Sequence, residues 1–456
     1  MAGESPASPT GRQQSQLAVT ALAVLTGGLL LSLSVGRWAS IHNRTFDLAF
    51  YTRMAWGLAH GELHDPIVGA HFLGLHISPV LLLPGLVGRL LGTAQTLLIL
   101  QAAAVAAAAY PIARIGRRHL GDIGAVSAAL AWLLQPNLGH VVTYEFHPGT
   151  LALLPLAWGL DAVDRGDGRV LAWCVAGVLL CREDLGLVTA GMGLVLAWSP
   201  GRGRRTGLLI AGVSVAYVLL WAVALHPRYG PEEGSMQLHF GHLGDTVPEA
   251  ALAILLRPGE VIAHLLEPRR LLYPLKVLAP VALLPLLAPR WLLVALPVVA
   301  MNLLSQFPTT TGLDSHYLSP ALPALVVAAI VGTKRLSRVL TPAQQVSVLP
   351  MAVLVAHALV GGTPLARDHQ AGEFTPDAYS DSASRVLDQI PPGASVQAPD
   401  GLLAHLAERR VLHRGPPPAR GTEFVVVAGE ERARWRGRED HEVVAEHGEL
   451  VLLRRR

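Results

Sequence analysis

Long apolar runs, separated by short polar segments, fill the first 363 residues of the chain. A helix needs about 20 apolar residues to cross a bilayer, and fewer where the protein interior dips into the membrane. Nine runs predict membrane-spanning helices, at approximately 17–36, 94–113, 122–138, 149–163, 206–225, 271–288, 291–304, 317–333 and 345–363. Two shorter runs, 170–181 and 185–198, meet at a charged triplet and bring the expected number of spans to about 11.

Arginine and lysine in the short loops give the expected orientation, because such loops stay in the cytoplasm. The clusters are Arg114/Arg117/Arg118, Arg165/Arg169, Arg202/Arg204/Arg205, Arg290 and Lys334/Arg335/Arg338. With a cytoplasmic tail at 1–16, all five clusters face the cytoplasm only if the apolar segment 78–92 does not cross. This segment is short and broken by Pro84 and Gly85, so we expect it to be interfacial or re-entrant. A multi-span domain over 17–363 then has a long first outward loop at 37–93.

The segment 364–456 has a different pattern and predicts a small soluble α/β domain on the outer face. Helices are expected at 384–390 and 401–407, and strands at 394–398 and 423–427. The segments 442–445 and 450–453 are expected to pair as a hairpin around Gly448. The fold class expected is thus an all-α polytopic membrane protein with a small extracytoplasmic α/β domain.

Composition supports a membrane protein with a polar tail and excludes an ordinary soluble domain over the first 363 residues. Apolar residues make up 51% of the chain and charged residues 15%, against about 25% in soluble domains. Of the 69 charged residues, 28 lie in 364–456, and too few are left to cover a soluble surface elsewhere. The formal net charge of +3 does not indicate a nucleic-acid partner, and we expect none. The lipid bilayer of the plasma membrane is the expected surrounding.

The first outward loop carries candidate chemistry at both of its ends. Asp47 lies at the first turn of an amphipathic helix predicted along the membrane interface. Its carboxylate is either a base that faces a cavity or a helix-start acid favoured by the helix dipole. His71 and His76 lie where the chain returns to the apolar phase, and they either contact a phosphate or anchor the loop.

Arg182, Glu183 and Asp184 give the strongest signal, because they interrupt an otherwise continuous apolar run. The flanking helices are too short to cross the hydrocarbon layer separately, so the triplet is expected at depth in a water-filled or protein-lined pocket. Arg182 can fork onto a phosphate, while Glu183 or Asp184 can orient it or hold a divalent cation. The alternative is a self-neutralised structural ion cluster.

Two further outward turns hold ionisable groups next to span boundaries. Glu145 and His147 lie in the sequence YEFHP, where they either line a cavity or belong to an interfacial belt. His316 and Tyr317 precede a late span, and function and ordinary loop chemistry are equally plausible there. The motif HFGH at 239–242 has two histidines but no third ligand at a recognised spacing, so it is a weak metal signal. Metal dependence is left open.

Several motifs, in order, resemble a bacterial multi-span family, domain-of-unknown-function family 2079. They are FDLAFY, HISPVLLLPGLVGRLLG, LLILQ, YEFHPGTLALLPLAW, CREDLG and HYLSPALPAL. That family looks like a branch of the GT-C glycosyltransferases, in which an acidic residue of the first outward loop acts at the active site and the donor is a sugar on a polyprenyl phosphate. By position, Asp47 matches the acidic residue. Arg182 falls where many relatives have lysine.

The function expected from the residues and the resemblance is transfer of a sugar from a polyprenyl phosphate to an envelope glycan, lipid or protein on the outer face. In this reading Asp47 is the base, Arg182 with His71 or His76 clamps the phosphate, and Glu145 and His147 contact the acceptor or sugar. The alternatives are a transporter or flippase of a lipid-linked or anionic solute, and a scaffold whose tail binds envelope components.

Overall fold

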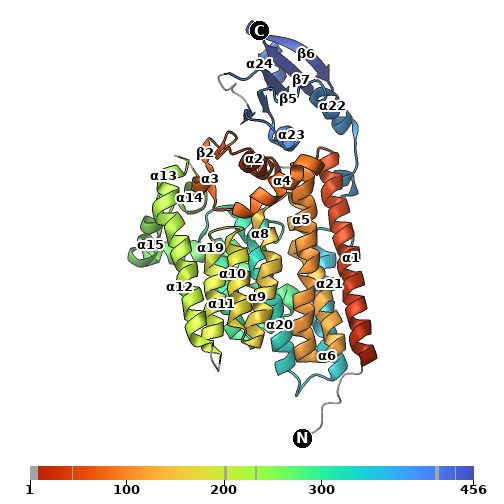
Figure 1. The fold of residues 1–456 in the computed structure, drawn as a ribbon, viewed down its shortest axis with the longest axis vertical. Helices are drawn as coiled ribbons and strands as arrows, with labels where there is room; N and C mark the ends of the chain where they lie inside the picture. The colour runs from red at the N-terminus through yellow and green to blue at the C-terminus, as the bar shows by residue number, and fades with distance from the viewer. Residues whose placement is uncertain (1–8, 44, 200–202, 232–233, 416–420, 437) are drawn as a thin grey trace.

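The chain folds into an elongated helical body with a small sheet domain at one end, as seen in a computed structural model (Figure 1). The structure describes residues 9–43, 45–199, 203–231, 234–415, 421–436 and 438–456. The end of α11 (Gly186–Trp198), the start of α12 (Arg204–Leu220) and the connection from α20 (Leu322–Arg335) to α21 (Pro342–Val360) lie at the end opposite the sheet domain (Figure 1). Lys334 and Arg335, two of the basic residues expected in the cytoplasm, lie at this end.

Five helical stretches of the described residues are long and apolar enough to cross a membrane. They are α1 (Pro9–Ala39), α5 with α6 (Thr93–Ala107, Ala109–Leu133), α12 with η2 and α13 (Arg204–Leu220, Trp221–Leu225, His226–Tyr229), η6 with α20 (His316–Ala321, Leu322–Arg335), and α21 (Pro342–Val360). Shorter apolar helices include α10 (Gly168–Leu179), α11 (Gly186–Trp198) and α19 (Pro289–Leu304). The all-α polytopic body is thus confirmed.

Several of the expected spans are shorter or more broken than the apolar runs suggest. The run 149–163 is divided into α8 (Pro148–Leu151) and α9 (Leu153–Arg165). The run 271–288 becomes α17 (Pro268–Leu271), α18 (Tyr273–Leu278), η3 (Ala279–Val281) and η4 (Leu284–Leu287). Proline lacks the backbone donor that a helix interior needs, and Pro280 and Pro285 interrupt this run. Apolar composition alone does not reveal such breaks.

The chain reverses direction at Gly121, between the two expected spans 94–113 and 122–138. Gly121 has a φ of 78°, a left-handed conformation that favours glycine. On either side, a Cβ on Gly116 would lie 2.4 Å from the carbonyl oxygen of Gly124, so the two arms touch backbone to backbone. The two spans are therefore the arms of a helical hairpin that turns at Gly121, and they are separate spans, as the sequence predicts.

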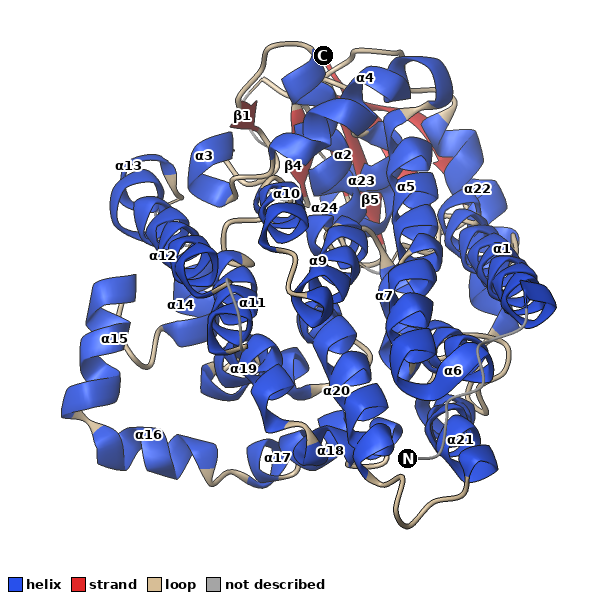
Figure 2. Ribbon diagram, turned by 60° about the horizontal axis from the view of Figure 1, so that its bottom comes forward, coloured by secondary structure: helices blue, strands red, loops and turns tan. Residues whose placement is uncertain are grey.

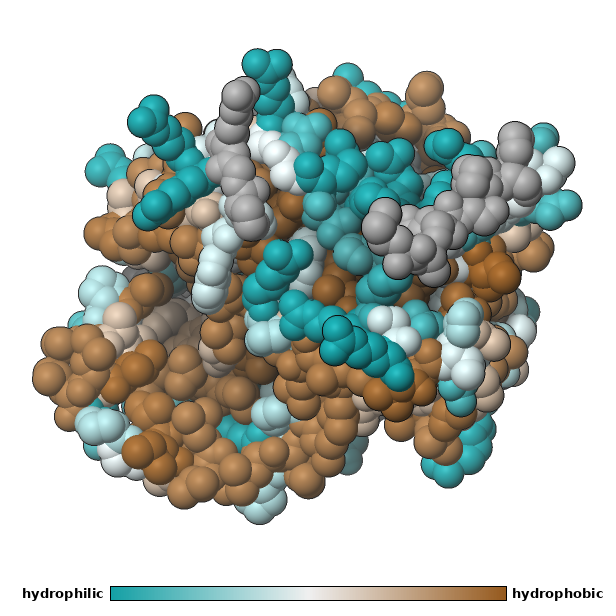
Figure 3. Space-filling model, turned by 90° about the horizontal axis from the view of Figure 1, so that it is seen from below, coloured by the Kyte–Doolittle hydropathy of each residue, from teal (hydrophilic) through white to brown (hydrophobic). Residues whose placement is uncertain are grey.

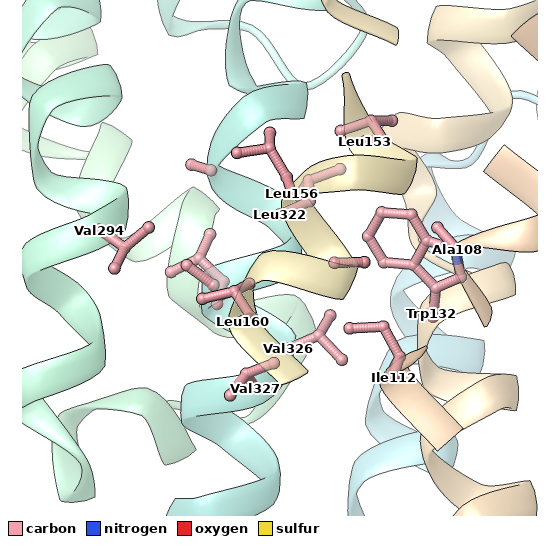
Figure 4. Close-up of a cluster of buried hydrophobic side chains, with 14 of the residues drawn as sticks. Ala108, Ile112, Trp132, Leu153, Leu156, Leu160, Val294, Leu322, Val326 and Val327 are labelled. Atoms are coloured by element: carbon pink, nitrogen blue, oxygen red, sulfur yellow. The ribbon is translucent and has the colours of Figure 1, made fainter. Parts of the chain in front are cut away.

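One buried apolar core holds α5, α6, α9, α19 and α20 together. Figure 4 shows part of it, with Trp132 beside Ala108 and Ile112, and with Leu156 of α9 close to Leu322 of α20. The indole nitrogen of Trp132 donates to the carbonyl oxygen of Val105 at 2.9 Å, which satisfies the one polar atom of a fully buried ring. The opposite end from the sheet domain has hydrophilic side chains around its middle and apolar ones along its rim (Figure 3).

The segment 37–93, expected as the first outward loop, forms a cap of short elements over one end of the body (Figure 1). Its elements are α2 (Asp47–Ala59), β1 (His64–Asp65), β2 (Ala70–His71), α3 (Phe72–Leu75), η1 (Pro79–Leu81) and α4 (Leu82–Leu91). A Cβ on Gly85 of α4 would lie 2.0 Å from the carbonyl oxygen of Ala55, so α4 packs tightly on α2. The stretch Pro79–Leu91 is about 20 Å long at 1.5 Å per residue, too short to cross a hydrocarbon layer of about 30 Å.

An arc of helices at the edge of the body connects α13 to α18 (Figure 2). It consists of α14 (Ser235–Phe240), α15 (Val247–Leu256) and α16 (Pro258–Leu265), followed by α17. Leu252, Leu255 and Leu256 of α15 are exposed. This part of the expected outward loop is therefore apolar on its surface, and its leucines are suited to contact with lipid rather than water.

The C-terminal domain is a five-stranded sheet in the order β4-β3-β5-β7-β6. Its elements are η7 (Ala371–Phe374), α22 (Ala378–Leu387), β3 (Val396–Ala398), α23 (Asp400–Leu406), β4 (Leu412–Arg414), β5 (Phe424–Ala428), α24 (Glu431–Arg436), β6 (His441–His447) and β7 (Leu450–Arg455). The expected strands at 394–398 and 423–427 are found as β3 and β5. The hairpin around Gly448 is also confirmed, since β6 and β7 pair antiparallel across it.

Candidate functional site

The carboxylate of Glu145 organises the site by binding the start of α2. Its Oε1 accepts from the backbone N–H of Thr45 at 2.7 Å, and its Oε2 accepts from that of Leu48 at 2.6 Å. The N-cap of α2 is Phe46, whose side chain cannot accept, so Glu145 satisfies donors that a helix start leaves free. Pro148 keeps His147 extended before α8, and this turn carries Glu145 to α2.

Glu145 is itself buried, with 2% of its surface exposed. Burial raises the pKa of Glu145 to about 8, and the negative charge of Asp47 adds to this effect, while the donated N–H groups oppose it. Both oxygens of Glu145 are engaged by backbone N–H groups, so Glu145 holds the start of the helix that carries Asp47. In this arrangement its carboxyl group has no exposed side for the expected contact with an acceptor or sugar.

Asp47 pairs with His147 at the first turn of α2. The Nε2 atom of His147 lies 3.3 Å from Oδ2 of Asp47, and the Asp47 side chain keeps 27% of its exposure. Burial raises the pKa of Asp47, but the hydrogen bond and charge of His147 and the hydroxyl of Thr45 outweigh it, so the pKa lies below its ordinary value of 3.8. Asp47 is therefore an ionised, accessible carboxylate at neutral pH.

The imidazole of His147 also stacks on that of His316. The two ring centroids are 3.5 Å apart, and the rings are nearly parallel. Tyr317 follows directly, with its hydroxyl 3.4 Å from Nε2 of His239. The Nδ1 atom of His239 lies 2.9 Å from the hydroxyl oxygen of Ser305. The late motif HYLSP and the HFGH segment thus join the same cluster as Asp47.

Arg182 and Asp184 form a fork at the turn between α10 and α11. The Nε and Nη2 atoms of Arg182 donate to the two oxygens of Asp184 at 3.0 and 2.8 Å. The side chains keep 18% and 26% of their exposure. Glu183 points inward instead, 1% exposed, with Oε1 2.8 Å from Nδ1 of His76 and Oε2 accepting from the backbone N–H of Ile77 at 2.8 Å. The triplet is thus partly self-neutralised, as one reading of the sequence anticipates.

Tyr51 is a buried residue whose hydroxyl feels the charges of both Asp47 and the Arg182 triplet. It lies one helical turn after Asp47 on α2, is 4% exposed, and packs edge-on against His147 at a centroid distance of 5.8 Å. Burial raises the pKa of its hydroxyl, and the charges of Arg182 and Asp47 both act on it. Tyr51 was not predicted as a site residue from the sequence, although its i,i+4 spacing from Asp47 places both on one helix face.

Of the two histidines expected at a phosphate, the structure brings only His76 to the cluster. His71 caps α3, where its Nδ1 accepts from the backbone N–H of Leu73 at 3.2 Å, and its ring lies 4.9 Å from that of Tyr229. In the described part of the chain, no contact joins His71 to Asp47 or Arg182. His71 therefore caps α3 and packs against Tyr229 in this structure, and its place in a phosphate clamp stays a prediction.

The donor set does not fit a metal ion. Within the described residues, no group of three or more His, Cys, Asp or Glu is arranged to hold one. The oxygens of Glu183 are taken by His76 and Ile77, and those of Asp184 by Arg182. Among the described residues, Glu183 and Asp184 are thus engaged by protein donors and do not form a metal-binding group with other His, Cys, Asp or Glu.

Comparison with known proteins identifies the family. A family model described as "Predicted membrane protein (DUF2079)" matches residues 37–424, which include every group described above. The chain belongs to the DUF2079 family. No curated protein sequence matches it.

Solved structures with the same architecture are similar to this DUF2079 chain in fold but not in sequence. ArnT from Cupriavidus metallidurans bound to undecaprenyl phosphate is 14% identical, with a TM-score of 0.54 over 95% of this chain and 98% of that one. The apo state of the same ArnT is 13% identical, with a TM-score of 0.53 over 93% and 97%. The oligosaccharyltransferase of Archaeoglobus fulgidus in the apo form is 12% identical, with a TM-score of 0.46 over 90% and 69%. This DUF2079 chain is a multi-pass membrane protein with the fold of ArnT.

Proposed function

We propose that this protein is a glycosyltransferase that moves a sugar from a polyprenyl phosphate to an acceptor hydroxyl on the extracytoplasmic face. The observation that carries the proposal is that an ionised Asp47, paired with His147, and the forked Arg182 both act on the buried hydroxyl of Tyr51, in a chain with the fold of ArnT. A related fold, that of ArnT, has been solved with undecaprenyl phosphate bound, which supports a polyprenyl-phosphate donor. The acceptor is an envelope glycan, a lipid or a protein.

The proposed reaction uses the cluster as follows. The acceptor oxygen attacks the anomeric carbon of the sugar, and the bond from that carbon to the phosphate oxygen breaks. Asp47 takes the proton of the acceptor hydroxyl as that oxygen attacks. The polyprenyl phosphate leaves with the bonding electron pair, and the guanidinium of Arg182 stabilises its charge. For this, the phosphate replaces Asp184 on the Arg182 fork.

The remaining groups hold these two in place. Glu145 fixes the start of α2, which carries Asp47, and the buried Tyr51 lies within range of the charges of both Asp47 and Arg182. Glu183 ties the Arg182 turn to the segment at His76 and Ile77. In the proposed topology the N-terminus is cytoplasmic, and the C-terminal domain lies outside, above the cluster.

The test is sugar transfer by the purified chain in proteoliposomes, with defined polyprenyl-phosphate sugars and membrane-extracted acceptors. Transfer by the wild type, and its loss in Asp47→Asn, is the expected result. Counterflow of a lipid-linked or anionic solute without transfer would instead support the transporter alternative.

A further inference from the structure

The C-terminal domain shares one hydrophobic core with the segment that carries Asp47. Leu48, Phe50 and Tyr51 of α2 belong to the same buried cluster as Leu402 and Leu403 of α23. α23 packs directly on α2. A domain that only tethers a partner has no need of such a core, because burial of apolar side chains fixes the relative position of the two parts.

Polar contacts fix this domain at three separate points. Nε2 of His405 lies 2.9 Å from the carbonyl oxygen of Trp38, and the two rings stack with centroids 4.8 Å apart. Oε1 of Glu408 accepts from the backbone N–H of Thr93 at 2.6 Å. Arg410 pairs with Glu62 at 2.8 Å. The domain therefore bridges the ends of α1 and α5 and the loop after α2.

Arg414, at the end of β4, contacts the start of the helix that carries Asp47. Its guanidinium carbon lies 3.8 Å from the centroid of the Phe46 ring, and Phe46 is the N-cap of α2, directly before Asp47. Its Nε and Nη2 donate to the two oxygens of Asp400 at 3.0 and 2.7 Å. A fork on Asp400 and a stack on Phe46 leave the guanidinium one orientation.

We propose that the C-terminal domain is a working part of the candidate site, in which Arg414 is a positioning residue that fixes Phe46 and, through it, the carboxylate of Asp47. The proposal rests on the proposed function only for the role of Asp47 as the acting carboxylate. Because the helical body and the C-terminal domain both contribute to the site, Asp47 stays in place only while the C-terminal domain is packed on α2.

The electrostatics of Asp47 agree with this arrangement. After burial, which raises the pKa of Asp47, and His147 and Thr45, which lower it, the positive charge of Arg414 is a further cause of the low value. The other groups whose charges act in this neighbourhood are Glu145, Tyr51, Tyr317 and Arg182. The permanent cations of this neighbourhood are Arg182, from the helical body, and Arg414, from the C-terminal domain.

The experiment measures the protonation of Asp47 directly, without any sugar donor. The full-length chain in nanodiscs is treated with a water-soluble carbodiimide and an amine, which together label protonated carboxyl groups, and Asp47 is quantified by mass spectrometry between pH 4 and pH 7. In Arg414→Gln we expect Asp47 to be labelled about threefold faster at a given pH, because loss of the positive charge of Arg414 raises the pKa of Asp47. Arg414→Lys keeps the charge and is expected to recover most of the wild-type profile.

The domain offers a matched control in Arg438. It forks onto Asp440 at 2.9 and 2.9 Å and lies 4.8 Å from the Trp435 ring, so it repeats the Arg414 arrangement away from α2. Arg438→Gln is expected to leave the labelling of Asp47 unchanged. Hydrogen exchange of the amides at 46–50 is measured on the same samples, and we expect it to rise in Arg414→Gln and in Phe46→Leu.

Equal labelling of Asp47 in Arg414→Gln and Arg438→Gln, with unchanged exchange at 46–50, would overturn the proposal. If Arg414→Gln does not fold, hydrogen exchange of the amides at 46–50 is compared between Arg414→Lys, Phe46→Leu and the wild type instead. A changed labelling profile without sugar transfer by the wild type would refute the proposed function alone. Transfer by the wild type with an unchanged profile would refute only the role of Arg414.

Discussion

Nε2 of His147 lies 3.3 Å from Oδ2 of Asp47, which joins the turn between α7 (Pro136–Tyr144) and α8 to the first turn of α2. The same turn supplies Glu145 to the backbone of α2, so one short segment both positions Asp47 and keeps it charged. The chemistry of the site is therefore created by tertiary contacts between segments that are far apart in the sequence.

Asp47→Asn is expected to reduce sugar transfer by at least about 100-fold, because an amide cannot take the proton of the acceptor hydroxyl. The substitution is nearly isosteric, so the thermal unfolding temperature is expected to stay close to that of the wild type. Transfer rates in proteoliposomes measure the effect. Asp388→Asn, at an exposed position of the C-terminal domain, is the control and is expected to have full activity. Full activity of Asp47→Asn would exclude the base role.

Glu145→Ala is expected to destabilise the protein by about 2 to 4 kcal/mol, because it leaves the buried N–H groups of Thr45 and Leu48 without acceptors. Thermal unfolding in detergent measures the loss. The control is Glu249→Ala, which removes an exposed carboxylate that also accepts two backbone N–H bonds, from Asp245 and Thr246. Its cost is expected to be about 1 kcal/mol or less. Equal costs for the two variants would contradict a structural role of Glu145 at α2.

The raised pKa of Glu145 also predicts the direction in which pH changes the stability of the protein. Its pKa in the folded chain, about 8, lies above the ordinary value of 4.5, so the folded state holds this proton more tightly than the unfolded state. Its contribution is complete below pH 4.5 and is lost as the pH rises through 8. The unfolding temperature is therefore expected to fall by several degrees between pH 6 and pH 9, and by less in Glu145→Gln. The same slope in both proteins would assign the effect to another group.

The pairing of Arg182 with Asp184 predicts that substitutions of these two residues have opposite effects on donor binding. Arg182→Ala is expected to weaken binding of undecaprenyl phosphate by about 10- to 100-fold, the value of a charge-assisted hydrogen bond. Asp184→Asn removes the competing carboxylate and is expected to tighten binding severalfold. Native mass spectrometry in detergent measures both, with the exposed Arg338→Ala as control. Unchanged binding in Arg182→Ala would exclude Arg182 as the phosphate ligand.

Close packing of α4 on α2 gives a prediction for a residue outside the site. Gly85→Ala places a methyl group 2.0 Å from the carbonyl oxygen of Ala55, so the helices must separate. We expect a loss of about 1 to 3 kcal/mol, the usual cost of overpacking, together with reduced transfer because α2 carries Asp47. Gly28→Ala in α1 has open space around its Cβ and is expected to be neutral or stabilising. Stability and transfer are measured in parallel, and a neutral Gly85→Ala would refute the tight contact.

The sequence predicts the helical body well, because apolar runs of sufficient length leave few alternatives in a bilayer. It also predicts the hairpin near Gly121 and the β6–β7 pair around Gly448, where glycine and flanking periodicity mark the turns. The divided spans and the three-residue strand β4 were missed. Pro280 and Pro285 break the run 271–288, although its apolar composition is that of a single span. β4 follows a charged segment, Glu408–Arg410, and carries two polar residues of three, so it has no apolar run to mark it.

The sequence predicted several residues of the candidate site, but not the contacts between them. Asp47, His147 and Arg182 were singled out because charge near a span boundary is costly unless it has a function. That Glu145 caps α2 was not foreseeable, since a carboxylate that binds backbone N–H groups of a distant segment leaves no local pattern. Tyr51 was missed because an aromatic residue on an amphipathic helix usually packs in a core. That His71 caps α3 was not foreseeable either, because capping and phosphate contact have the same sequence signature.

The most direct test of the account is an electron cryomicroscopy structure of the full chain in nanodiscs with undecaprenyl phosphate. We expect density for the phosphate in contact with the guanidinium of Arg182, Asp184 displaced from the fork, and the carboxylate of Asp47 facing the same space with His147 still beside it. Phosphate density away from Arg182, or Asp47 turned from the bound lipid, would contradict a common reaction centre and with it the proposed transfer.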